Sequence, residues 1–115
     1  MVDQADEITL WKAPQSGRLG SKEITFGYDP AEYPGDGPYF TTDPDIADVF
    51  QAGYKNGIEV IHIPNKVFHD LVDLGVIVPD AFYPLGKSYH VPVQGLPAFN
   101  QAIKLGSPNE YHPQD

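Results

Sequence analysis

The sequence predicts a single small α+β domain, and three observations support this fold class. Its 115 residues suit one compact domain and leave no room for a second one. Short apolar runs with strand character are interspersed with segments whose apolar residues have helical spacing. The 12 prolines and 11 glycines predict many turns and short elements instead of long helices.

The first strand is expected over residues 8–13, where Pro14 ends it. Residues 1–7 are polar and acidic, and we expect a disordered lead-in there. Residues 15–37 are rich in turn dipeptides, and only residues 23–26 have the character of a short strand or helical turn. A long irregular loop in a compact domain is usually functional or disordered.

The sequence Gly-Pro-Tyr-Phe-Thr-Thr at 37–42 predicts a second strand over 38–42, which we interpret as a strand that lines a ligand. A helix follows, because Asp43 suits the N-cap and Pro44 the first helical position. It is expected to end before the Asn-Gly pair at 56–57. Its predicted apolar stripe consists of Ile46, Val49 and Phe50.

The second half of the chain continues with strands and short helices. Strands are expected over 58–63, 76–78 and 88–93, and alternation along the first of them places Glu59 and Ile61 on one face or leaves Val60 and Ile63 partly buried. The expected helices run from a cap at Asn65 through Leu74, with Gly75 as a left-handed stop, and over 97–105. The domain would then span 8–105, followed by a loose polar tail over 106–115.

Charge and composition exclude several classes of function. The net charge of −9 opposes contact with a polyphosphate backbone, so we expect no nucleic-acid partner. The chain has no cysteine, which excludes thiol catalysis and zinc-thiolate sites. No apolar run approaches 20 residues and the N-terminus does not resemble a signal peptide, so no membrane association is expected. Arg18 is the sole arginine, which makes it a candidate for binding a phosphate or carboxylate.

No familiar metal or hydrolase motif is present. The four histidines include no pair at helical spacing, and Asp43, Asp45 and Asp48 suit the start of a helix better than a calcium loop. We therefore expect no metal. No serine lies on a nucleophile elbow and no glycine-rich phosphate loop precedes a helix. His90 is open to two interpretations, as a structural histidine or as a residue that touches substrate.

The order of several short patterns resembles the ADP-ribosyltransferase superfamily. These patterns are a strand ending in a cation at Lys12, a long loop with Arg18, the Tyr39-Phe40-Thr41-Thr42 strand, a helix with Ala-x-x-Phe, a strand ending in Ile-Pro and a late strand with a Tyr-x-Val-Pro pattern. The chain is most similar to the toxin domains at the C-termini of Rhs-type polymorphic toxins. This resemblance implies a compact fold with a mainly antiparallel, split sheet and two or three short helices.

The resemblance also implies a substrate and a set of roles. NAD would be the substrate, with Lys12 and Arg18 on its phosphates or ribose, Tyr39 stacked on nicotinamide and the neighbourhood of Ser88 orienting the reacting ribose. Thr41 and Thr42 would bond the ribose. For Tyr39, plain core packing is the alternative interpretation.

The chain departs from the family pattern at Lys12, where Arg or His is commoner, and at Ser88, where a catalytic Glu is usual. A carboxylate from Glu59 or Glu110 would replace that acid, or Ser88, Tyr89 and His90 would orient the ribose with neutral groups. Cleavage of NAD would require oriented groups more than a strong nucleophile, because the reacting ribose becomes oxocarbenium-like.

The expected function is therefore an NAD-consuming toxin domain that transfers ADP-ribose to a protein acceptor in a target cell, or that hydrolyses NAD. Such a domain would be secreted within a larger delivery protein, would act in the target-cell cytoplasm and would have a cognate immunity protein. The alternative from another class is a non-catalytic acidic immunity or inhibitor protein that binds a basic partner through electrostatic steering.

Overall fold

Six strands form one antiparallel sheet in the order β4-β5-β2-β1-β3-β6. The structure is a computed structural model that describes residues 6–80 and 87–113. The strands are β1 (Glu7–Lys12), β2 (Tyr39–Thr41), β3 (Ile58–Pro64), β4 (Val78–Pro79), β5 (Ser88–His90) and β6 (Glu110–His112). The expected α+β class and the antiparallel pairing are confirmed.

The sheet consists of two three-stranded parts that meet at one place. β1 pairs with β3 over six positions, from Glu7 opposite Pro64 to Lys12 opposite Glu59, and β3 pairs with β6. On the other side, β2 pairs with β5 and β5 with β4. Between β1 and β2 a single registered pair, Trp11 and Thr41, joins the two parts. The strands thus belong to one continuous sheet rather than two separate ones.

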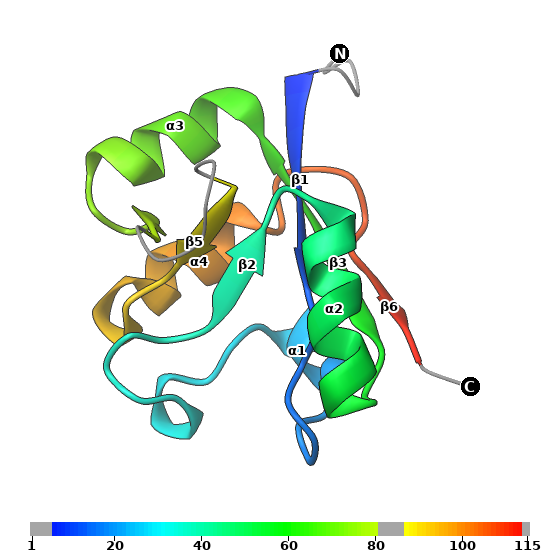
Figure 1. The fold of residues 1–115 in the computed structure, drawn as a ribbon. Coiled ribbons are helices and arrows are strands. Elements are labelled where there is room, and N and C mark those ends of the chain that lie inside the picture. The colour runs from blue at the N-terminus through cyan, green and yellow to red at the C-terminus, as the bar shows by residue number, and fades with distance from the viewer. Residues whose placement is uncertain (1–5, 81–86, 114–115) are drawn as a thin grey trace.

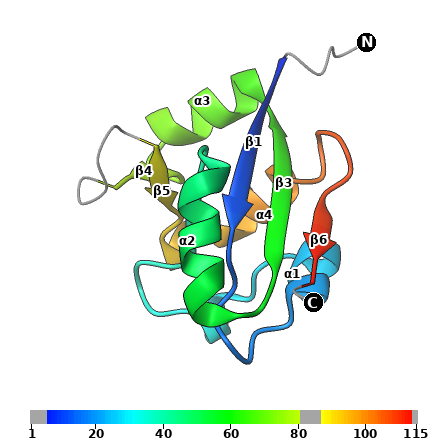
Figure 2. The same cartoon turned by 45° about the vertical axis from the view of Figure 1, so that its right-hand side comes forward.

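The helices cover both faces of this sheet (Figures 1 and 2), with α2 on one face and α4 on the other. They are α1 (Gly20–Phe26), α2 (Pro44–Tyr54), α3 (Asn65–Asp73) and α4 (Leu96–Ala102), with short 3-10 turns η2 (Pro30–Glu32) and η4 (Val93–Gly95). The number of α-helices therefore exceeds the two or three expected. None of the helices in the described ranges combines the length and apolar character that crossing a bilayer requires.

The hydrophobic core lies between the sheet and helices α3 and α4. Alternation along β1 and β3 sends every second side chain to this side, so Leu10 and Ile61, which are opposite one another, are both buried. Aromatic rings fill the space between them and the helices, with Phe40 and Phe99 at 5.0 Å between ring centroids. The expected grouping of Glu59 with Ile61 on one face is confirmed, and both are 0% exposed.

Helix α2 begins as the sequence predicts. The Asp43 carboxylate accepts a hydrogen bond from the Asp45 N–H at 3.0 Å, and Pro44 is the first helical residue. Its buried face differs from the expected stripe, since Val49 is exposed and Ala47 is buried. Ile46 and Phe50 face a pocket instead of the core.

Helix α3 differs from the expectation at its start and agrees at its end. Pro64 is the N-cap residue and Asn65 is already helical, with no side-chain capping bond. Gly75 has the expected left-handed backbone, with φ of +77°. The Val76 N–H then donates to the Leu71 carbonyl at 2.9 Å, which closes the helix end.

Both ends of the described chain are more ordered than the sequence pattern suggests. Glu7, expected in the lead-in, begins β1, and its carboxylate accepts hydrogen bonds from the Ser107 backbone N–H and hydroxyl at 2.8 and 2.9 Å. The prediction of a loose tail is wrong for Glu110–His112, which forms β6 against β3. The expected strand or turn at 23–26 is part of α1.

Candidate functional site

A pocket of about 440 Å³ opens between α2, the ends of β1 and β2, and the loop that precedes β2. This volume lies within the range of small-molecule sites. Its aromatic lining residues are Trp11, Tyr33, Tyr39, Phe40, Phe50 and Tyr54. Its polar lining side chains are Lys12, Gln15, Arg18, Thr41, Asp80 and Ser88.

The aromatic lining forms two flat surfaces. Phe50 and Tyr54 lie one helical turn apart on α2 and stack on each other, with ring centroids 6.1 Å apart. Across the opening, Tyr39 on β2 is 47% exposed and lies 5.4 Å from the His90 ring on β5. An exposed tyrosine on a central strand is unusual for core packing, so the structure favours the ligand-lining interpretation of Tyr39 over the core interpretation.

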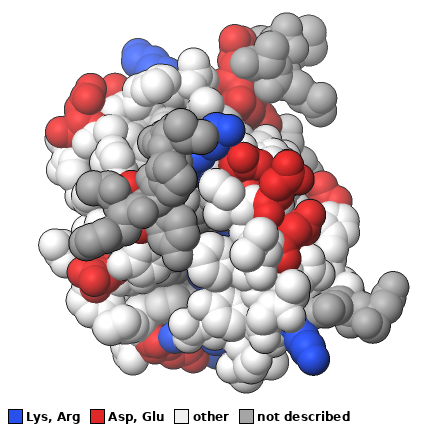
Figure 3. Space-filling view, in the orientation of Figure 1, with Lys and Arg blue, Asp and Glu red and all other residues white. Residues whose placement is uncertain are grey.

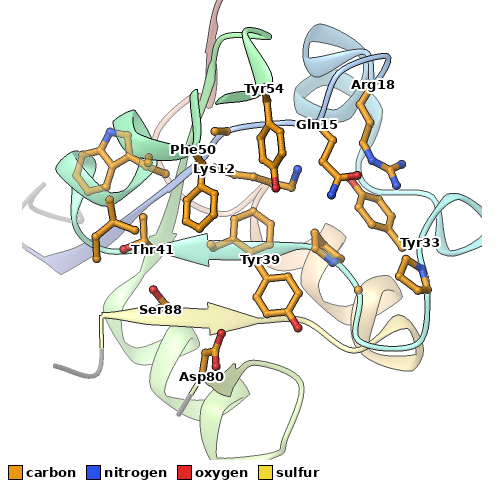
Figure 4. A pocket seen from close by; sticks show the side chains of 18 residues that line it. Lys12, Gln15, Arg18, Tyr33, Tyr39, Thr41, Phe50, Tyr54, Asp80 and Ser88 are labelled. Atoms are coloured by element: carbon orange, nitrogen blue, oxygen red, sulfur yellow. The ribbon is translucent and has the colours of Figure 1, made fainter. Parts of the chain in front are cut away.

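The two cations of the pocket lie together at one end (Figure 4). The Arg18 guanidinium lies 3.9 Å from the centroid of the Tyr33 ring, and its Nη2 donates to the Glu32 carbonyl at 2.8 Å. Lys12 Nζ lies 5.8 Å from the same ring. These contacts hold two positive charges beside one tyrosine.

The opposite side of the pocket carries Ser88 and Asp80 (Figure 4). Ser88 is the first residue of β5, and its carbonyl accepts from the Asp80 N–H at 2.8 Å, just after β4. Both residues are buried, at 5% and 9% exposed. Asp80 is the one carboxylate among the side chains that line this pocket in the described part of the chain. The pocket therefore has a cationic end and an acidic end.

Thr41 lines the pocket, but its hydroxyl is occupied. It donates to the Lys87 carbonyl at 2.7 Å and accepts from the Asp43 N–H at 3.0 Å, so it fixes the turn between β2 and α2. Thr42 lies outside the lining; its backbone N–H donates to the same Lys87 carbonyl at 2.9 Å, and its hydroxyl makes a long contact of 3.5 Å to that carbonyl. These contacts favour a structural role for both hydroxyls over the expected role in binding ribose.

Three other candidates from the sequence, His90, Glu110 and Glu59, lie outside the pocket lining. The His90 ring lies beside Tyr39 at an interplanar angle of 30°, and its Nδ1 donates to the Asp36 carbonyl at 2.9 Å, which fixes the orientation of the imidazole ring. Glu110 is exposed on the edge strand β6 and does not approach the pocket.

Glu59 is fully buried on the core side of β3, opposite Lys12 in the β1–β3 pairing, and lies outside the pocket lining. Its carboxyl accepts a hydrogen bond from the Tyr28 hydroxyl at 2.5 Å. Burial, followed by a hydrogen bond to Glu23, raises the pKa of Glu59 to about 9. Burial likewise lowers the pKa of Lys12, and the charges of Glu59 and Glu23 oppose that shift.

Sequence reasoning missed Asp80, Phe50 and Tyr54 as site residues. The spacing of Phe50 and Tyr54 predicts that they share one helix face, and this signal is present in the sequence. Asp80 follows a strand of two residues in a turn-rich segment, and nothing in its local sequence marks it.

Acidic side chains outnumber basic ones on the face shown in Figure 3, where red groups are more frequent than the few separate blue ones and most of the remaining surface is uncharged. Within the described residues, no group of three or more histidine, aspartate or glutamate side chains could hold a metal ion.

Comparisons with protein-family models, with curated proteins and with solved structures gave no match.

The arrangement suits a flat, partly anionic ligand. A ring can lie between Tyr39 and the α2 aromatics, an anion can contact Lys12 and Arg18, and the Asp80 carboxylate can face a developing positive charge.

Proposed function

We propose that this chain binds NAD in the pocket and cleaves its nicotinamide–ribose bond, as a toxin domain of the ADP-ribosyltransferase type. The observation that carries the proposal is the convergence of Lys12, Arg18, Tyr39 and Ser88 on one pocket. These four residues come from separate segments of the chain, and the family resemblance of the sequence assigns each of them to NAD.

The charges of the pocket suit the electron movement of this reaction. When the bond from the ribose C1′ to the nicotinamide nitrogen breaks, its electron pair neutralises the ring and positive charge develops on the ribose. The Asp80 carboxylate would stabilise that charge, and Tyr39 would hold the departing ring. Asp80 would thus take the part for which the sequence interpretation offered a carboxylate from Glu59 or Glu110, or the neutral groups of Ser88, Tyr89 and His90.

The nucleophile distinguishes two outcomes of the same cleavage. Water would form a new C1′–O bond, lose a proton and release ADP-ribose, whereas a side chain of a protein acceptor would retain the ADP-ribose. Tyr39 is 47% exposed, so the pocket is open to solvent on that side, which admits either nucleophile.

The test is release of nicotinamide from NAD by the purified chain, with and without bacterial lysate. Release without lysate shows hydrolysis, and a labelled lysate protein shows transfer. Expression inside a sensitive bacterium should slow its growth. No release, no label and normal growth together would overturn the proposal.

Matched variants connect the activity to the pocket. Tyr39→Ala should lower kcat/KM about 10- to 100-fold, the range expected for a lost ring stack. Asp80→Asn should lower kcat about 100- to 1,000-fold through loss of a charge that stabilises the transition state. The controls are Phe26→Ala on α1 and Asp73→Asn on α3. Both positions are exposed and lie outside the pocket lining, so these substitutions should leave activity unchanged.

A further inference from the structure

A buried polar cluster lies behind the cationic end of the pocket. It consists of Lys12 from β1, Glu59 from β3, Glu23 from α1, and Tyr28 and Tyr33 from the chain that follows α1. Lys12, Glu23 and Glu59 are 6%, 3% and 0% exposed. Charged side chains are seldom buried to this extent unless they are paired. Their charges therefore have to be balanced within the cluster.

The hydrogen bonds of the cluster leave two carboxyl oxygens without a donor. Tyr28 donates to Glu59 Oε1, and Tyr33 donates to Glu23 Oε2. If both carboxyl groups are ionised, Glu59 Oε2 and Glu23 Oε1 are buried and accept no hydrogen bond within the described residues. No ion pair within 4.0 Å joins Lys12 to either carboxyl in the described part of the chain. Two buried acceptors with no donor would be costly.

One retained proton resolves this deficit. A protonated carboxyl group can donate to a neighbouring carboxylate, and the two buried oxygens that lack a donor belong one to Glu23 and one to Glu59. A hydrogen bond between these two side chains is also among the causes that raise the pKa of Glu59. Two carboxyl groups that share a site cannot both ionise without repulsion. With one shared proton the pair carries a single negative charge, which balances the ammonium of Lys12.

We propose that Glu23 and Glu59 share one proton and act as positioning residues for Lys12 and Tyr33 at the cationic end of the pocket. This inference rests on the proposed function, which assigns that end to the phosphates of NAD. The single negative charge keeps Lys12 protonated, and a second one would oppose a bound phosphate. Glu23 also accepts a hydrogen bond from the Tyr33 hydroxyl, and the Arg18 guanidinium packs over the Tyr33 ring.

The shared proton can be measured without any ligand. In chain labelled with ¹³C at the glutamate carboxyl carbons, one carboxyl of the pair should remain protonated at pH 7. Glu23→Gln and Glu59→Gln should each abolish that signal, because the amide N–H replaces the shared proton as the donor. Two ionised carboxylates at pH 7 in the unsubstituted chain would overturn the proposal.

The positioning role is tested by the affinity for ADP-ribose, measured by calorimetry from pH 6 to 10. At pH 7 the affinity of the Glu59→Gln variant for ADP-ribose should lie within about threefold of that of the unsubstituted chain. As the pH rises, the variant should begin to lose affinity at a higher pH than the unsubstituted chain does, because the variant has no shared proton to lose. The double variant with both glutamines should bind at least about tenfold more weakly at pH 8, because no negative charge then keeps Lys12 protonated. Glu110→Gln removes an exposed carboxylate on β6 and should change neither value.

The outcomes separate this inference from the proposed function. Unchanged affinity and pH profile in the folded double variant would overturn the positioning role. If the double variant does not fold, single variants whose pH profiles match that of the unsubstituted chain would overturn it equally. Absence of ADP-ribose binding by the unsubstituted chain would contradict the proposed function, and the carboxyl titration would still decide whether the proton is shared.

Discussion

Gly37 lies where the loop enters β2, and no other residue type fits its backbone. Its φ is +71°, and a Cβ at this position would lie 1.7 Å from the Val91 carbonyl oxygen. Gly37→Ala should therefore lower the free energy of unfolding by at least about 2 kcal/mol, since the left-handed backbone and the clash both contribute. Urea unfolding measures the change.

Gly35 provides the control for this substitution, because it lies in the same loop without a left-handed backbone, and a Cβ there would meet no atom within 4 Å. Gly35→Ala should change the free energy of unfolding by no more than about 0.5 kcal/mol. Equal effects of the two substitutions would show that the constraint is not specific to Gly37.

At the same scale, single residues differ in how well the sequence predicts them. The capping role of Asp43 follows from local chemistry alone, because an aspartate before a proline suits a helix start. The ligand-lining position of Tyr39 was predicted from the residues of its strand, and its role towards nicotinamide through a resemblance. The hydrogen-bond partner of Glu59 could not be predicted, because Tyr28 lies 31 residues away in the sequence.

At the scale of elements, β6 connects the end of the chain to the loop that carries Arg18. The Tyr111 hydroxyl donates to the Asn56 carbonyl at 2.9 Å, and the Asn56 amide donates to the carbonyls of Gln15 and Arg18, both at 2.8 Å. The strand therefore supports one wall of the pocket from the far edge of the sheet.

Tyr111→Ala tests this connection. It should lower the free energy of unfolding by about 2 kcal/mol, roughly half the cost of truncating a fully buried aromatic ring, because Tyr111 is half-buried. His112→Ala, at the next and exposed position of the same strand, should change it by less than about 0.5 kcal/mol. Thermal unfolding compares the two variants, and similar losses would mean that the tyrosine contacts contribute little.

Elements with strong local signals were predicted and those held by distant partners were not. Strands β1 and β3 have short apolar runs interrupted by polar residues at strand spacing, and α2 has its cap and proline, so each was found within a few residues. β6 has only three residues and exists because β3 offers it an edge. Helix α1 has no capping side chain and is held through Glu23, which bonds to Tyr33.

At the scale of the whole molecule, the buried carboxyl pair makes folding depend on pH. Glu59 has a pKa of about 9 in the folded chain and 4.5 as its ordinary value. The folded state therefore retains a proton that the unfolded state releases between these values. The stabilisation that this retained proton gives to the folded state is complete below about pH 4.5 and declines as the pH rises towards 9.

Glu59→Gln should remove this dependence, because a glutamine has no proton to release. We expect the free energy of unfolding of the unsubstituted chain, minus that of the variant, to fall by up to about 1.4 kcal/mol for each pH unit between about pH 5 and pH 8. Urea unfolding at each pH gives both values, and the difference cancels the effects of the other acidic residues and of the net charge of −9. The same subtraction with Glu110→Gln, an exposed carboxylate, should be flat within about 0.5 kcal/mol. A flat difference for Glu59→Gln as well would mean that Glu59 is ionised in the folded chain, and the two donorless oxygens would then require a donor other than a shared proton.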